Sequence, residues 1–245
     1  MPAFDNLNRP FDSESQSEAP CRWLSAGQDG NPFVIDGYDC LALVTSLVTA
    51  TSDPNIARKF VALRESSGRE YAGELPAEAR EIRYALAYPV HGAITEGPVF
   101  KASQMEEKWD VYLYDQRLYF CRSWTGELAY VGEFKITPAS REMFPVFANA
   151  GSALTVSRIW ASTDRASTGA GFAVRQTDYL IKRFLFQLRV PHPLPPDLRR
   201  DPETVGAYSF SQYGNMCCFG SFADTLPLTL VRPSWSAEVG TTKHS

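Results

Sequence analysis

One segment of the chain gathers side chains suited to holding an anionic ligand: Lys108, Trp109, Arg122 and Trp124. They lie in two stretches, EEKWDVY (residues 106–112) and LYFCRSWTG (residues 118–126), which a short polar turn separates. Both stretches alternate in the way that half-buried strands do, so they predict one β-hairpin. Alternation then puts Arg122 on the same face as Phe120 and Trp124.

Arg122 on an aromatic face has two interpretations. In the structural one it stacks between Phe120 and Trp124 and pairs with a carboxylate, Asp110 or Glu107. In the functional one its planar guanidinium faces a concave surface and binds an anion, for which its five donors are suited. The sequence leaves both open, although buried charges are normally paired.

Catalytic templates are missing from the sequence. It contains no nucleophile elbow, no zinc-protease helix motif, no phosphate-binding loop and no complete dinucleotide fingerprint. Adjacent carboxylates on a strand face opposite ways, which disfavours a dyad from Glu106 and Glu107. The histidines, His91, His192 and His244, are expected in surface or turn positions. No catalytic residue, metal ligand or cofactor is assigned.

Composition describes an ordinary globular protein of 245 residues, 44% of them hydrophobic, with a net charge of −4. That charge disfavours a dedicated nucleic-acid binder. The longest apolar stretch is too short to span a bilayer, and residues 1–20 lack the pattern of a signal peptide. Five cysteines, an odd number, fit a reducing compartment. We therefore expect a cytoplasmic protein without a membrane partner.

The periodicity predicts an α+β fold. Asp53 and Pro54 predict the start of a helix that ends at Gly68. Period-two alternation over residues 82–136 predicts an antiparallel meander in which neighbouring strands pair, with a further strand over residues 154–160. A second helix is expected over residues 173–188, with the pair Asp178 and Lys182 on its solvent face. Shorter strands are expected over residues 32–36 and 41–48.

Prolines at 191, 193, 195 and 196 predict the end of regular structure and a long irregular C-terminal segment. The expected architecture is an antiparallel sheet with one face covered by the two helices. The expected domain organisation is a flexible N-terminal segment (1–20), a single α+β domain (21–239) and a flexible C-terminus (240–245).

The two aromatic stretches, together with RQTDYLIK (residues 175–182) and PHPLPP (residues 191–196), resemble a family of uncharacterised bacterial proteins. The shared features are a tryptophan strand, a Leu-Tyr-Phe strand and an Arg-Ser-Trp-Thr-Gly turn, and the resemblance extends over residues 33–196. That family has no established activity, so the resemblance implies no catalytic residue.

The sequence is compatible with two functions. The first is a non-catalytic binding or regulatory protein that recognises a protein or a small anionic ligand through the region of Trp109, Arg122 and Trp124. The alternative is an enzyme acting on a nucleotide-like or phosphorylated small molecule, with Arg122 and Lys108 holding the anion and Glu107 or Asp110 as acid or base. A homo-oligomer is a further possibility, because edge strands and exposed aromatic residues can mediate self-association.

Overall fold

The structure is a computed structural model that describes residues 21–24, 28–29, 40–43, 51–90, 94–139, 151–188, 190–214 and 220–221. The strand expected over residues 32–36 lies outside these ranges, as do His91, His244 and both predicted flexible ends. Of the strand expected over residues 41–48, the structure describes β2 (Cys40–Leu43).

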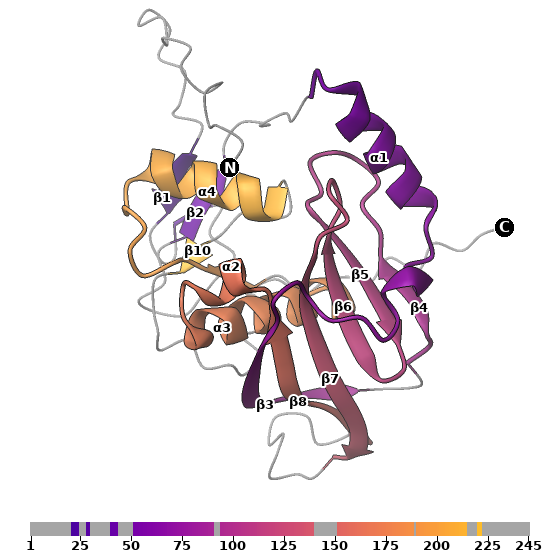
Figure 1. Cartoon of the computed structure of the whole chain (residues 1–245). Helices are drawn as coiled ribbons and strands as arrows, with labels where there is room; N and C mark the ends of the chain where they lie inside the picture. Colours follow the sequence, from indigo (N-terminus) through magenta and orange to yellow (C-terminus); the bar gives the residue numbers. More distant parts are fainter. Residues whose placement is uncertain are drawn as a thin grey trace, which may run out of the picture.

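A six-stranded antiparallel sheet forms the body of the molecule, in the order β3-β8-β7-β6-β5-β4 (Figure 1). Its strands are β3 (Arg80–Val90), β4 (Gly97–Phe100), β5 (Trp109–Tyr114), β6 (Arg117–Arg122), β7 (Leu128–Pro138) and β8 (Ser152–Ala161). The α+β class is confirmed, the expected meander holds for β5, β6 and β7, and the further strand expected over residues 154–160 is β8. The expectation that β3 also pairs with its sequence neighbour is wrong, because β3 pairs with β8 instead.

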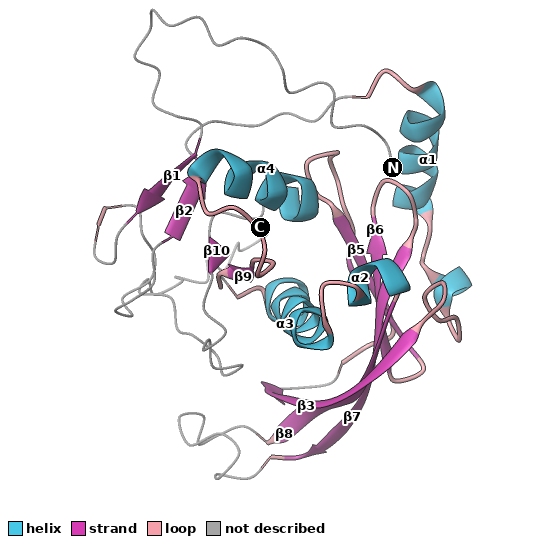
Figure 2. Cartoon of the chain, turned by 60° about the vertical axis from the view of Figure 1, so that its left-hand side comes forward, coloured by secondary structure: helices cyan, strands magenta, loops and turns pink. Residues whose placement is uncertain are grey.

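The two edge strands of this sheet, β3 and β4, each carry a proline. Pro89 lies opposite Ala153 of β8, and Pro98 lies opposite Tyr112 of β5. Proline has no backbone N–H, so it weakens any further strand pairing at an edge. In the described residues the sheet curves (Figure 2) but stays open between β3 and β4.

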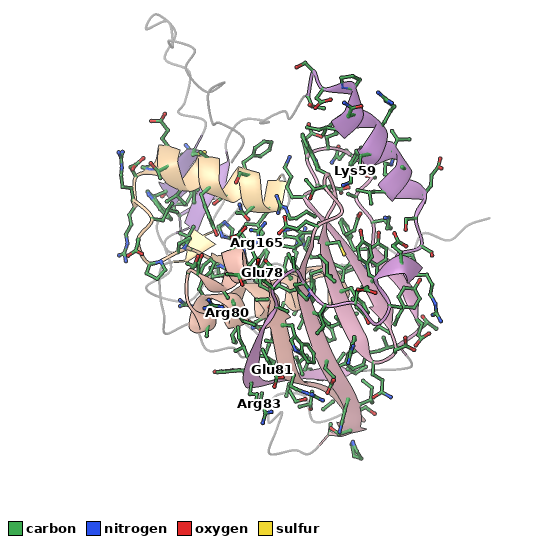
Figure 3. All side chains as sticks on the ribbon, viewed as in Figure 1. Lys59, Glu78, Arg80, Glu81, Arg83 and Arg165 are labelled. Carbon is green, nitrogen blue, oxygen red and sulfur yellow. The ribbon has the colours of Figure 1, made fainter. Side chains whose placement is uncertain are left out.

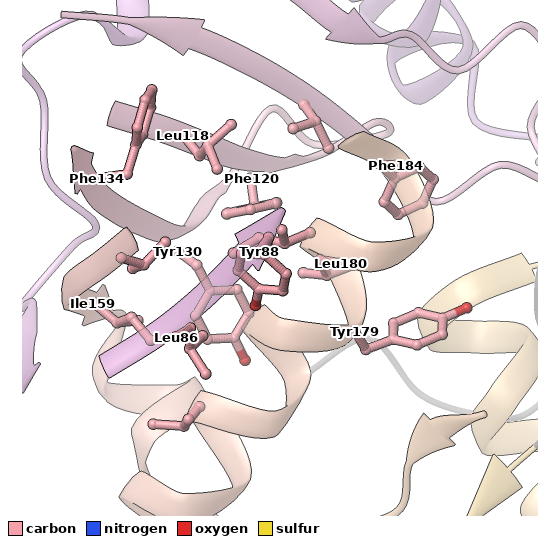
Figure 4. Close-up of a cluster of buried hydrophobic side chains, with 14 of the residues drawn as sticks. Leu86, Tyr88, Leu118, Phe120, Tyr130, Phe134, Ile159, Tyr179, Leu180 and Phe184 are labelled. Carbon is pink, nitrogen blue, oxygen red and sulfur yellow. The ribbon is translucent and has the colours of Figure 1, made fainter. Parts of the chain in front are cut away.

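A helix fills the inner side of the curved sheet (Figure 2). α3 (Ala170–Leu180) continues into a π-helical turn, η2 (Ile181–Leu185). Side chains of α3 and η2 join those of the sheet in the main core (Figure 4), which includes Leu86, Tyr88, Phe120, Tyr130, Phe134, Leu180 and Phe184. The second predicted helix is thus confirmed, although it begins three residues earlier than expected and changes its hydrogen-bond pattern at Ile181.

The outer face of the sheet is covered by an irregular segment, residues 66–79, which contains the short helix η1 (Arg69–Tyr71). Three contacts with sheet tyrosines hold it. The Tyr114 hydroxyl donates to Ser67 O at 2.8 Å, Gly73 N donates to the Tyr119 hydroxyl at 2.9 Å, and the Tyr71 and Tyr112 rings stack 5.6 Å apart. Both faces of the sheet are therefore buried near its centre.

The first predicted helix is α1 (Pro54–Glu65), and its N-cap is confirmed, since the Asp53 carboxylate accepts from Asn55 N at 2.8 Å. The helix ends at Glu65, before the expected Gly68, which instead has a φ of 78° and begins η1. The expectation that α1 covers the sheet is wrong. Phe60 is its one buried residue, so α1 lies beside the sheet and α3 alone fills the inner face.

A second cluster packs beside the sheet. It includes β1 (Cys21–Leu24), β2, β9 (His192–Pro193), β10 (Gly220–Ser221) and α4 (Pro202–Tyr213), with the short α2 (Thr163–Ala166) nearby. The expectation of an irregular chain after the prolines is wrong at α4. Asp201 caps this helix by accepting from Thr204 N at 2.9 Å, and Pro202 occupies the first turn. This is the same Asp-Pro signal that begins α1.

Candidate functional site

The predicted hairpin is confirmed, and its register brings the sequence-predicted residues together. Trp109 of β5 lies directly opposite Arg122 of β6, and the guanidinium stands 4.9 Å from the centroid of the Trp109 ring. Phe120 lies opposite Val111 on the same face. Arg122 is therefore on the aromatic face that the alternation predicts.

The partners of Arg122 are backbone carbonyls of α4. Its two terminal nitrogens donate to Ser211 O and Gln212 O, each at 2.8 Å, and the Trp109 indole also donates to Gln212 O at 2.7 Å. The expected carboxylate partners are engaged elsewhere. Asp110 pairs with Lys101 at 3.2 Å, and Glu107 accepts from the Ser103 hydroxyl at 3.0 Å.

Lys108 and Trp124 belong to the same arrangement. The Lys108 ammonium and the Trp124 indole both donate to Met105 O, at 2.8 and 2.7 Å. The ammonium also stands 4.4 Å from the Trp124 ring centroid and 5.1 Å from that of Phe210 in α4. All four sequence-predicted residues thus lie where α4 docks on the sheet.

The charges here match the dipole of α4. A helix C-terminus carries partial negative charge and unpaired carbonyls, which cations stabilise. Arg122 lies there with Lys108, and Arg165 donates to the Gln212 side chain at 2.8 Å. Burial and the neighbouring Arg165 lower the pKa of Arg122 to about 10, so it stays protonated at neutral pH. This geometry corresponds to the structural interpretation of Arg122, with carbonyls in place of a carboxylate.

A buried ionic array lies under β3, where the sequence analysis expected a solvent-facing pair. Asp178 and Lys182 are 7% and 4% exposed, their charged groups are 2.7 Å apart, and the Tyr88 hydroxyl donates to Asp178 at 2.7 Å. Burial raises the pKa of Asp178, and the contacts with Lys182 and Tyr88 oppose that rise. The solvent-facing assignment is therefore wrong, because this side of α3 packs on the sheet.

His192 also differs from expectation. It is fully buried, and its ring lies 4.4 Å from that of Tyr213 and 5.9 Å from that of Tyr179. Its Nδ1 lies 3.1 Å from Pro193 O, while Nε2 has no hydrogen-bond partner among the described residues. Burial lowers the pKa of His192 to about 4, so the ring is neutral at pH 7. The surface or turn position expected for it is wrong, because α4 and α3 enclose β9.

An open surface cavity of about 460 Å³ lies between the two edge strands and η2, and no sequence motif pointed to it. Its described lining residues are Pro89, Val90, Ile94, Thr95, Pro98, Val99, Leu185 and Phe186. They carry no charge and offer one side-chain hydroxyl, that of Thr95. A second cavity of about 420 Å³ shares Ile94 and extends towards β7.

One wall of the 460 Å³ cavity, at Phe186, packs against the ionic array of Tyr88, Asp178 and Lys182. The Phe186 ring stacks on Tyr88 at 5.3 Å, and Tyr88 donates to Asp178 behind it. Leu185 belongs to the π-helical turn, a feature that often occurs at functional sites. The ion pair thus supports Tyr88, against which the Phe186 side of the cavity packs.

The described residues offer few groups for metal binding or for nucleophilic catalysis by cysteine. They contain no cluster of three or more His, Cys, Asp or Glu that could hold a metal ion. Burial raises the pKa of the Cys121 thiol, so it is a poor nucleophile. Among the described helices, none has the length and apolar character needed to cross a membrane. No family model, curated protein or solved structure matches this chain.

Proposed function

We propose that this protein is a non-catalytic binding protein whose ligand is a small, uncharged, mainly apolar molecule held between β3 and β4. The observation that carries the proposal is the 460 Å³ cavity between Pro89 and Pro98. Ligand cavities in proteins have volumes of roughly 300–1,000 Å³ and combine apolar walls with a few polar groups. The lining side chains found here are apolar apart from Thr95, and backbone polar groups share the wall with them.

Two further features support a cavity that exists before the ligand arrives. The prolines on both edges oppose closure of the gap by strand pairing. Phe186 is fixed against Tyr88, whose hydroxyl is itself held by Asp178. A preformed cavity reduces the ordering cost of binding.

The Arg122 region is the less favoured ligand site in this proposal. Two donors of Arg122 are occupied by α4 carbonyls at 2.8 Å, and its ring contact is with Trp109 of the same hairpin. An anion would have to compete with the helix terminus for the same guanidinium. The enzymatic alternative is disfavoured for a related reason, since Asp110 and Glu107 are both engaged in local hydrogen bonds.

The proposal is tested with a hydrophobic fluorescent probe and calorimetric titration of small neutral apolar compounds. Val99→Trp adds a large side chain to the cavity wall, and Val61→Trp is the matched control because Val61 lies 54% exposed on α1. We expect binding to the wild type and to Val61→Trp, and loss of binding in a folded Val99→Trp. Equal affinity in all three proteins, or no binding by the wild type, would contradict the proposal.

A further inference from the structure

The first half of β3 is an open strand edge. Residues 80–85 are exposed or half-buried on both faces, and Tyr84 is 44% exposed. In the described part of the chain β8 is the strand that pairs with β3, which leaves the other edge of β3 without a strand. Figure 3 shows Arg80, Glu81 and Arg83 along this edge.

A row of charged residues crosses the sheet and ends at this edge. Arg117 of β6 lies opposite Glu133 of β7, Glu133 lies opposite Arg158 of β8, and Arg158 lies opposite Arg83 of β3. Arg158 and Arg117 both pair with Glu133. The row therefore has one glutamate between Arg117 and Arg158, and a second arginine, Arg83, directly beside Arg158. Directly opposite like charges destabilise a sheet, so Arg83 favours an anion on its open side.

We propose that two copies of this chain associate through antiparallel pairing of the first half of β3, with Ile82 opposite the partner's Ile82 across the two-fold axis. Residues directly opposite each other in an antiparallel ladder point to the same face, and the two-fold axis runs perpendicular to the sheet. The axis must therefore pass midway between one residue and the same residue of the partner. With the axis at Ile82, Glu81 lies opposite the partner's Arg83, and the reverse pair forms by symmetry. Arg80 lies opposite the partner's Tyr84.

The neighbouring registers are disfavoured by charge. An axis at Glu81 places two glutamates against each other, and an axis at Arg83 does the same with two arginines. With the axis at Ile82, Arg83 at the end of each charged row lies opposite the partner's Glu81. The negative charge that Arg158 does not provide on one side of Arg83 is then provided on the other. Glu81 also keeps its contact within the chain, 2.9 Å from Arg83, so the four charges form one network.

The length of the pairing is limited. A bulge between Arg83 and Leu86 interrupts the ladder, and Pro89 removes a donor beyond it. A pair of strands this short buries less than the roughly 1,600 Å² of a standard interface. The expected product is a weak, reversible dimer whose population rises with protein concentration.

Sedimentation equilibrium over a series of concentrations tests the proposal with the whole chain. We expect the wild type to dimerise, and Glu81→Arg and Arg83→Glu each to raise the dissociation constant about tenfold or more. The double variant E81R/R83E restores the opposite charges and should restore the dimer. Lys59→Glu, an exposed charge reversal on α1, is the control and should leave the association unchanged.

Melting temperatures of all variants show whether each is folded. A wild type that stays monomeric at every concentration would overturn the proposal. So would a dimer that survives both single reversals, because it would form through another surface. Failure of the double variant to regain what the single variants lose would overturn the proposed register.

Discussion

Replacement of Arg122 by alanine tests how α4 is attached to the sheet. The change removes two charge-assisted hydrogen bonds, both of 2.8 Å, and the contact with Trp109. Each such bond contributes about 1.5–3 kcal/mol where it is well shielded from water. Water can replace part of it at this half-buried position, and Trp109 still donates to Gln212 O. We therefore expect a loss of about 2–4 kcal/mol from the free energy of unfolding.

The assay is urea unfolding followed by circular dichroism, together with amide hydrogen exchange over residues 202–213. For a chain of this size the melting temperature should fall by roughly 5–15 °C. Arg58→Ala is the matched control, because Arg58 is exposed and its hydrogen bonds within the described residues go to the first turn of its own helix. We expect a change within about 0.5 kcal/mol. An unchanged unfolding free energy in Arg122→Ala, with α4 amides protected as in the wild type, would refute the docking role.

Three other predictions concern buried groups. Asp178→Ala leaves the Lys182 ammonium buried without its carboxylate, and chemical denaturation should show a loss of about 3–5 kcal/mol. Gly68→Ala should destabilise the protein more than Gly73→Ala in the same assay. Both glycines have positive φ, but a Cβ at Gly68 would lie 2.1 Å from a tyrosine ring, whereas none lies within 4 Å at Gly73. His192 stays neutral in the folded protein down to a pKa of about 4, while the unfolded chain takes up its proton below pH 6.5. Stability should therefore fall between pH 6.5 and about 4, by up to about 3 kcal/mol, and His192→Gln should reduce that loss in urea titrations at each pH.

Local signals in the sequence were sufficient for the hairpin of β5 and β6. Alternation placed Trp109 and Phe120 on one face, and the turn between the strands has the positive φ values, 49° and 58°, of a tight hairpin. The partner of Arg122 could not be predicted in this way. It lies about ninety residues away on α4, and nothing in the spacing of the hairpin indicates which helix will dock there.

The sequence contained a signal for the burial of Asp178, although its spacing to Lys182 was interpreted as a solvent-facing pair. Val174, Asp178, Ile181 and Leu185 follow one another at intervals of four, three and four, which places Asp178 within the apolar stripe of the helix. An acidic residue in such a stripe indicates a buried partner. The spacing to Lys182 suggested a solvent-facing pair instead, although the same spacing also occurs in buried ion pairs.

The pairing of β3 with β8 depends on contacts between residues about seventy positions apart, which no local pattern encodes. It determines both proposed surfaces, because it leaves β3 and β4 as the edges of the sheet.

The bulge between Arg83 and Leu86 divides β3 into two parts with different surroundings. Before the bulge the strand is exposed and charged, which suits pairing with a second copy. After it, Tyr88 and Val90 turn into the core, and Pro89 and Val90 line the cavity. Since the bulge separates the ladders of the two halves, charge reversals at Glu81 and Arg83 leave the cavity wall in place.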